Sequence, residues 1–167
     1  MPLIQPSTSI RTYMGELFDV LHPNPEQIHL EDIAHALSNL CRFGGHTDRF
    51  YSVAQHSVMM ATLEMVPDEL RLTALLHDAS EAYLVDVPSP IKQLLPKYQE
   101  IEEMIHLCVA RRFGLTYPWS EIIHQADREM LDREMGRVFV MGKWVSWSPM
   151  AAENMFLITY KKFTSGR

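Results

Sequence analysis

The sequence has only two cysteines and no long hydrophobic run, and both features exclude certain kinds of protein. Cys41 and Cys108 lie far apart and share no CxxC spacing, so neither a disulfide framework nor a thiolate zinc site is expected. No apolar stretch approaches the roughly 20 residues that a membrane-spanning helix needs. The start, Met-Pro-Leu-Ile-Gln-Pro, lacks the basic and apolar regions of a signal peptide. We therefore expect a soluble, cytoplasmic protein with no membrane partner.

Positive charge is also scarce in this chain. It has 15 Lys and Arg residues against 21 Asp and Glu residues, which gives a formal net charge of -6 at pH 7. Proteins that bind nucleic-acid polymers or anionic membranes carry basic stripes, and we find none here. A small anionic substrate remains compatible with this balance, because local cations or a bound metal can hold it.

Helical periodicity dominates the chain after its first 29 residues. Residues 1–29 contain β-formers, glycine and the turn signal His22-Pro-Asn-Pro25, which predict a short irregular or extended N-terminal arm. Apolar residues then recur at helical spacing in several segments. These segments are Leu30 to Leu40, Val53 to Leu63, Pro67 to Leu76, Tyr98 to Phe113, Trp119 to Val140 and Pro149 to Phe163, with a short helix around Ile91 to Leu95. We expect an all-α fold in one domain, residues 1–167, with a helical core over 30–167.

The adjacent pair His77 and Asp78 is the most informative feature of the sequence. It lies inside the apolar run Leu72-Thr-Ala-Leu-Leu-His-Asp-Ala-Ser-Glu81. Polar groups in a core segment need partners, and a divalent metal satisfies an imidazole and a carboxylate together. A continuous helix would place Glu81 on the same face as the pair. A single histidine on an apolar helix is more often a hydrogen-bonded core residue, so the pair alone decides nothing.

Further metal-ligand types occur once on each of two other predicted helices. His56 lies on the second helix and Asp127 on the helix that begins near Trp119. Metal sites in helical scaffolds draw their ligands from several helices, because one helix face cannot surround an ion. Two histidines and two aspartates suit Mn, Co, Zn, Ni or Fe better than calcium. A divalent ion in such a site acidifies water for attack on phosphorus, which favours hydrolysis.

The order His56, His77-Asp78, Asp127 resembles the H...HD...D signature of the HD-domain phosphohydrolase superfamily. The stretch from His77 to Lys92 is similar to the segment that follows the HD pair in bacterial 5′-deoxynucleotidases and in phage and bacterial deoxynucleoside triphosphohydrolases of the dATPase type. Ser52-Val-Ala-Gln-His-Ser57 resembles their first-ligand helix, and the likeness covers roughly Cys41 to Arg133. It implies a compact HD-domain helical bundle that forms a homo-oligomer.

The resemblance also implies a role for each matching residue. Glu81 would be the general acid and base, and Asp86 would support catalysis and line the nucleotide pocket. Arg42 would meet the phosphate, Phe43 the sugar or base, and Lys92 the substrate. One divalent transition metal would be held by His56, His77, Asp78 and Asp127.

The expected function is therefore metal-dependent hydrolysis of phosphate esters of 2′-deoxynucleotides. Two substrates remain open: a monophosphate cleaved to deoxynucleoside and phosphate, or a triphosphate such as dATP cleaved to deoxynucleoside and triphosphate, with additional Mg²⁺ for the latter. Gln55 stands where the better-known nucleotidases often have a carboxylate.

Two other functions fit the same residues. An HD-fold di-iron oxygenase would need further imidazole ligands, for which His46, His106 and His124 are the candidates. A non-catalytic, metal-stabilised binding module would use the ligands alone, and it would have no need of Glu81 and Asp86.

Overall fold

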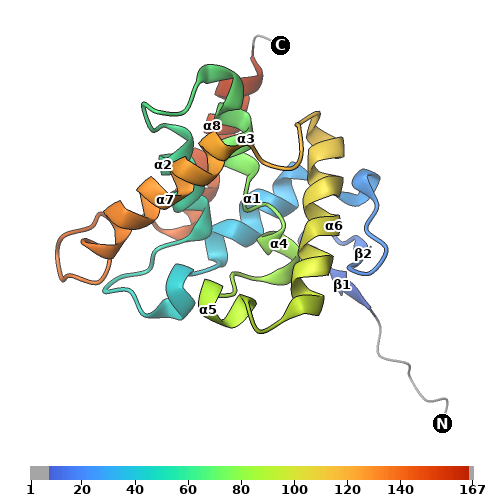
Figure 1. Cartoon of the computed structure of the whole chain (residues 1–167), viewed down its shortest axis with the longest axis horizontal. Helices are drawn as coiled ribbons and strands as arrows, with labels where there is room; N and C mark the ends of the chain where they lie inside the picture. Colours follow the sequence, from blue (N-terminus) through green and yellow to red (C-terminus); the bar gives the residue numbers. More distant parts are fainter. Residues whose placement is uncertain (1–7, 166–167) are drawn as a thin grey trace.

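The computed structural model describes residues 8–165, so the first seven residues of the predicted N-terminal arm lie outside it. The described chain is mostly helical, as the sequence predicted, with one small β-hairpin at its beginning (Figure 1). None of the helices among residues 8–165 combines the length and the hydrophobicity that a membrane crossing requires.

The N-terminal arm folds as a β-hairpin followed by a short turn of helix. Strand β1 (Ser9–Arg11) pairs antiparallel with β2 (Leu17–Asp19), and η1 (Pro25–Gln27) follows. Phe18 is fully buried, and its ring stacks on that of Tyr83 at a centroid distance of 4.2 Å. The predicted extended arm is thus confirmed for its described residues, and the arm is attached to the helical core by an aromatic contact.

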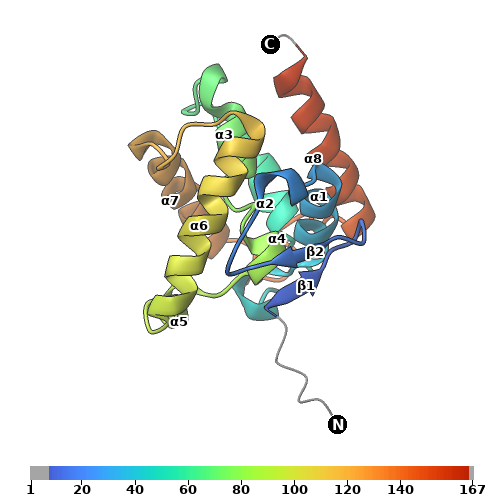
Figure 2. The ribbon, with the colours of Figure 1, turned by 90° about the vertical axis from the view of Figure 1, so that its right-hand side faces the viewer.

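Helix α2 is the central element of the fold. It contacts α1, α3, α7 and α8, and α8 lies on the side opposite to α6 and α7 (Figure 2). A helix surrounded in this way is apolar on most of its faces, and Val53, Ala54, Val58 and Met60 are all buried. The helix bounds are α1 (Leu30–Asn39), α2 (Val53–Ala61), α3 (Arg71–Leu76), α4 (Glu81–Leu84), α5 (Ser89–Lys92), α6 (Pro96–Phe113), α7 (Glu121–Met135) and α8 (Pro149–Thr164).

The buried apolar side chains form one contiguous cluster. Its members come from the hairpin, from α1 to α4 and from α6 to α8, and include Ile33, Leu37, Leu75, Ile123 and Phe156. The predicted stripes therefore face a common core, since a helix stripe of this kind is stable only when another element covers it.

Two predicted helix extents are wrong. The segment from Pro67 to Glu81 is η3 (Asp68–Leu70), α3 and α4, with a turn over residues 77–80 between the last two. In that turn the amide N of Glu81 donates to the carbonyl O of Asp78 at 3.0 Å. This hydrogen bond spans three residues, as in a 3₁₀-helix, instead of the four of an α-helix. Likewise α7 ends at Met135 rather than near Val140, one residue before Gly136.

Candidate metal centre and its cavity

The four predicted metal ligands come together from three places in the fold. His56 lies on α2, His77 and Asp78 lie in the turn after α3, and Asp127 lies on α7. One ligand atom from each of His56, His77 and Asp127 lies within 4.8 Å of the others. Because α2 contacts both α3 and α7, its buried histidine reaches ligands from both neighbours.

Asp78 completes the set beside these three residues. Its Oδ2 lies 3.1 Å from Nε2 of His77 and 3.6 Å from Nε2 of His56. Oδ1 of Asp127 lies 3.3 Å from Nε2 of His56 and 3.8 Å from Nε2 of His77. Metal–ligand bonds of about 2.1 Å place neighbouring ligand atoms roughly 3.0–3.5 Å apart, so these separations suit one shared cation.

The imidazole nitrogens that face these carboxylates have no well-formed hydrogen bond among residues 8–165, and only the carboxylates of Asp78 and Asp127 lie near them, at 3.1–3.8 Å. Nε2 of His56 and Nε2 of His77 are both buried without a hydrogen-bond partner among the described residues. The opposite nitrogens are engaged: Nδ1 of His77 lies 2.8 Å from the carbonyl O of Ala74, and Nδ1 of His56 lies 2.6 Å from Oε1 of Glu134. Because a carbonyl only accepts, His77 carries its hydrogen on Nδ1, which frees the Nε2 lone pair for a metal. The donor set fits a divalent transition metal.

The charges of the cluster also favour a cation. Burial by itself would lower the pKa of His77, but the negative charges of Asp78 and Asp127 outweigh it and raise that pKa well above its usual value. These groups therefore favour a positive charge among them, which a bound metal cation would supply in place of the proton.

Glu134 is a site residue that the sequence analysis missed. It is fully buried on α7, and its Oε1 accepts hydrogen bonds from Nδ1 of His56 and from the Tyr51 hydroxyl, at 2.6 Å and 2.5 Å. Its Oε2 accepts from a guanidinium nitrogen of Arg42 at 2.8 Å. Burial favours the neutral acid, but these hydrogen bonds and the adjacent charges lower the pKa of Glu134, so it is buried as a carboxylate. Nothing in its sequence context distinguishes it from other helix glutamates, because Arg42, Tyr51 and His56 approach it from other parts of the chain.

A cavity of about 580 Å³ opens beside the metal cluster. Asp78 and Asp127 form part of its wall, so the cluster borders the space where a substrate would lie. All the predicted substrate and catalytic residues belong to the same wall: Arg42, Phe43, Glu81, Asp86 and Lys92. His46, one of the three histidines considered as ligands of a second iron, lines this cavity too.

The apolar part of the cavity wall comes from residues that the sequence analysis did not select. Leu131 and Met135 on α7, Phe139 beyond its end, and Val87 and Pro88 line the cavity. The rings of Phe43 and Phe139 meet edge to face at a centroid distance of 5.1 Å. The cavity lining therefore combines charged side chains with apolar and aromatic ones.

Glu81 is a buried carboxyl group in the cavity wall. Its side chain is 5 % exposed, and its Oε2 is buried without a hydrogen-bond partner among the described residues. Burial, followed by the charges of Asp78 and Asp86, raises the pKa of Glu81 well above its usual value. Glu81 therefore keeps a proton at a pH where a solvated glutamate has lost it.

The two cationic side chains predicted to bind the substrate already form ion pairs within the protein. Arg42 is nearly buried, and its terminal guanidinium nitrogens lie 2.8 Å from Oε2 of Glu134 and 3.8 Å from Oδ2 of Asp78. Its Nε is buried and has no hydrogen-bond partner among the described residues. Its guanidinium carbon lies 5.0 Å from the Phe43 ring centroid. Nζ of Lys92 forms an ion pair with Oε1 of Glu102 at a distance of 2.6 Å.

Backbone strain accompanies the position of Phe43. This residue lies in the short helix η2 (Arg42–Gly45) and has φ 55° and ψ 31°, the left-handed region that non-glycine residues rarely adopt. Such conformations cost of order 1 kcal/mol and concentrate at functional sites. The strained turn places the Phe43 ring beside Arg42 at the cavity.

The histidines considered for a second iron do not join the metal cluster. Nε2 of His106 lies 2.7 Å from the Ser80 hydroxyl, and burial lowers the pKa of His106 to about 4. His124 is exposed on α7. Over residues 8–165, the group of mutually close ligand atoms contains neither of them, nor His46.

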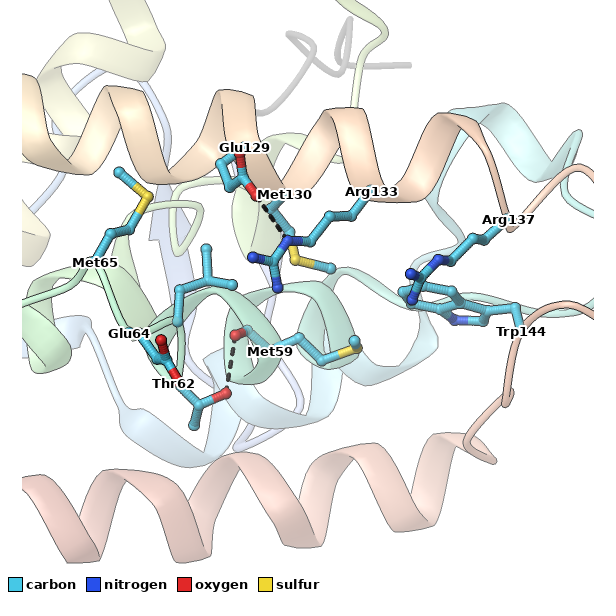
Figure 3. A pocket seen from close by; sticks show the side chains of 10 residues that line it. Met59, Thr62, Glu64, Met65, Glu129, Met130, Arg133, Arg137 and Trp144 are labelled. Carbon is cyan, nitrogen blue, oxygen red and sulfur yellow. Dashed lines mark hydrogen bonds and ion pairs between the residues drawn. The ribbon is translucent and has the colours of Figure 1, made fainter.

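A larger cavity lies elsewhere and contains none of the predicted site residues. It has a volume of about 870 Å³ between the end of α2 and the outer face of α7 (Figure 3). Met59, Met65 and Trp144 supply much of its wall, and the charged Arg133 is already paired with Glu129 at 2.8 Å. The larger cavity therefore lacks the cluster of metal-ligand atoms that borders the smaller one.

Comparison with known proteins assigns the chain to a family. It is 44% identical to the uncharacterized protein YfdR of Escherichia coli over 125 residues, which are 75% of this chain and 69% of that protein. It is 40% identical to an uncharacterized protein of Rhodobacter capsulatus over 113 residues, which are 63% of this chain and 58% of that protein. No family model matches the sequence. The chain belongs to the family of YfdR, and neither relative's name states an activity.

Proposed function

We propose that this protein is a metal-dependent phosphohydrolase of the HD-domain superfamily that removes phosphate from 2′-deoxynucleoside 5′-monophosphates. One observation carries the proposal: two buried, unpartnered imidazole nitrogens face Asp78 and Asp127 at the wall of a cavity that also contains Glu81. The resemblance of the segments around His56 and His77 to nucleotidases supports the nature of the substrate.

The protein would hold the metal at one end of the cavity and the nucleoside at the other. His56, His77, Asp78 and Asp127 are the ligands, and a divalent ion bound there polarises the phosphate and acidifies the attacking water. The guanidinium group of Arg42, which lines the cavity, would donate to a phosphate oxygen. The rings of Phe43 and Phe139 provide apolar surface for the sugar and base.

Glu81 is suited to transfer the proton that the reaction requires. When the bond between phosphorus and the 5′ oxygen breaks, the leaving alkoxide needs a proton to become a hydroxyl group. The raised pKa of Glu81 keeps a proton on its carboxyl group for this transfer, and the attacking water returns one proton to Glu81. Asp86, on the same wall, contributes charge that keeps Glu81 protonated.

The charge of the cavity favours a monophosphate over a triphosphate. Its acidic residues are Asp78, Glu81, Asp86 and Asp127. Against them, Arg42 and Lys92 are each engaged by a glutamate of the protein. A single phosphate can be neutralised mainly by the divalent metal ion, whereas a triphosphate carries about two more negative charges, for which neither Arg42 nor Lys92 is free.

The proposal is tested by hydrolysis of a nucleotide panel in the presence of Mn²⁺ or Co²⁺. The panel contains deoxyribonucleoside and ribonucleoside monophosphates and dATP, with separate detection of released phosphate and triphosphate. We expect phosphate from the deoxyribonucleoside monophosphates, and a loss of about 10²–10⁴-fold in kcat for Glu81→Gln with metal binding retained. Glu121→Gln, an exposed carboxylate on α7, is the matched control and should keep full activity.

Several outcomes separate this proposal from its alternatives. Release of triphosphate from dATP, without hydrolysis of any monophosphate, would show that the substrate is a triphosphate and that the reaction is still metal-dependent hydrolysis. Metal binding without hydrolysis of any nucleotide would instead favour the binding module.

A further inference from the structure

A second cavity lies at the hairpin, away from the metal cluster. It has a volume of about 300 Å³ and contains none of the residues predicted for the hydrolytic site. The hairpin lies against α1 and α4 in this region (Figure 2), so the cavity is walled by all three elements. Its polar lining is Arg11, Thr12, Tyr13, Asp32, His35 and Tyr83.

Asp32 is a buried carboxylate that is only half satisfied. Its side chain on α1 is 2 % exposed, and Oδ1 accepts a hydrogen bond from the amide N of Met14 at 2.6 Å. Its Oδ2 is buried and has no hydrogen-bond partner among the described residues. An ionised carboxylate out of water requires a compensating cation or donor, and neutral groups compensate it poorly.

Two hydroxyl groups on the same cavity are also without side-chain partners. The Thr12 hydroxyl is buried and makes no hydrogen bond within residues 8–165, and the buried Tyr83 hydroxyl has no side-chain partner there and lies near the backbone of His29. Tyr83 is 5 % exposed, so its phenol is as deeply placed as Asp32. A hydroxyl both donates and accepts, whereas a carboxylate only accepts, so together these atoms match a ligand group with several donors.

The remaining wall is aromatic and apolar. The Tyr13 ring stacks on His35 with centroids 3.8 Å apart and an interplanar angle of 10°. His35 is held in place by Glu153, because Oε2 of Glu153 lies 3.1 Å from Nδ1 of His35. Aromatic faces attract cations through their quadrupole. Ile10, Ala36 and Ala82 complete the lining with small apolar contacts.

We propose that this cavity binds a small organic ammonium ion. The ammonium group would donate to Oδ2 of Asp32 and to the hydroxyls of Tyr83 and Thr12, because three N–H donors on one charged centre match these three acceptors. The apolar body would lie against Tyr13 and the small residues. A simple alkylamine and an α-amino acid share this chemistry, and the carboxylate of an amino acid would pair with Arg11, which lines the cavity.

This cavity and the hydrolytic cavity share one element of structure. In α4, Glu81 lines the hydrolytic cavity, while Ala82 and Tyr83 line the second one. A ligand seated on Tyr83 therefore contacts the turn of helix that carries Glu81. The binding itself does not depend on the proposed hydrolase activity and is tested without it.

The test is an amide NMR titration of the whole protein with matched small molecules at constant ionic strength. Isoamylammonium chloride carries the charge, isoamyl alcohol replaces the ammonium with a hydroxyl on the same body, and leucine adds a carboxylate. We expect saturable shifts at Met14, Asp32 and Tyr83 with the ammonium ion, and none with the alcohol or with KCl. If leucine also binds and Arg11→Ala weakens leucine alone, the amino acid is the better ligand.

Asp32→Asn is the decisive variant, because the amide keeps an acceptor for Met14 and removes only the charge. We expect isoamylammonium to bind about 10–100-fold more weakly to it. Glu31→Gln, the exposed neighbour on α1, should bind as the wild type does. Equal binding by folded Asp32→Asn would overturn the proposal. If this variant does not fold, the wild-type titration decides alone: equal shifts with the ammonium ion and the alcohol overturn it, and selective shifts support it.

Discussion

Nδ1 of His56 lies 2.6 Å from Oε1 of Glu134, and neither side chain has any exposure to solvent. The same carboxylate also accepts from Tyr51 and Arg42. The histidine is therefore held in one orientation by a group that is itself fixed on three sides. This contact joins the core helix α2 to α7, the helix that carries Asp127.

Glu134→Gln is expected to weaken metal binding. The amide can still accept from His56, but it loses the negative charge that makes the imidazole a stronger ligand, so the affinity should fall about 10–100-fold. Competition with a chromophoric chelator measures this change. Glu129→Gln, at a half-exposed position on the same helix, is the control, and an unchanged affinity in Glu134→Gln would remove the proposed positioning role.

Metal is expected to stabilise the folded protein. A ligand that binds only the folded state at 100 times its Kd adds about 2.7 kcal/mol to the free energy of unfolding. Mn²⁺ or Zn²⁺ should therefore raise the Tm of the wild type, and a chelator should reverse the shift. Asp127→Ala should lose the response, whereas Asp132→Ala, exposed on the same helix, should keep it. The same metal-induced shift in both variants would argue against the assigned cluster.

Phe139→Ala is expected to affect substrate binding more than the chemical step. The ring contacts Phe43 and forms the apolar side of the cavity, and an aromatic ring stacked on a base contributes about 1–3 kcal/mol. The KM for the nucleotide should rise about 5–100-fold with little change in kcat. Met141→Ala, at an exposed position in the same segment, should leave both constants unchanged. A loss in kcat alone would place Phe139 outside the nucleoside contact.

His106 is expected to make the stability depend on pH. Burial lowers its pKa from the usual 6.5 to about 4 in the folded protein. As the pH falls from 6.5 towards 4, the unfolded chain takes up a proton at this position before the folded one does. The free energy of unfolding therefore falls in that window, by about 2 kcal/mol from this group. Urea unfolding across the window should show a smaller decrease for His106→Gln, and parallel curves for the two proteins would contradict this assignment.

The predicted metal ligands illustrate what local pattern can reveal. His77 and Asp78 are adjacent, so one tight turn presents both side chains in any compact fold. His56 and Asp127 were selected because each is a ligand type in a helical segment, and the structure brings both to the same cluster. The expected position of Glu81 on one continuous helix was wrong, since a turn separates α3 from α4, yet Glu81 still lines the cavity with Asp78.

Other parts of the site depend on contacts between segments far apart in the chain. Glu134 is a common helix residue by sequence, and it becomes distinctive only because Arg42, Tyr51 and His56 approach it from other elements. Phe139 joins the cavity because the chain after α7 turns back towards Phe43. Such contacts leave no periodic signal, so neither residue could be selected beforehand.

The helical class, the extended N-terminal arm and the residue types of the candidate metal cluster could be predicted from the sequence, because periodicity and ligand chemistry are properties of short segments. The structure was needed to show which nitrogens are left without partners, how far Arg42 and Lys92 are already neutralised, and that Asp32 is buried with one oxygen unsatisfied. These properties depend on burial and on pairing across the whole fold. The pair His77 and Asp78 could be recognised from its neighbours in the chain, whereas Glu134 could be recognised only from its neighbours in space.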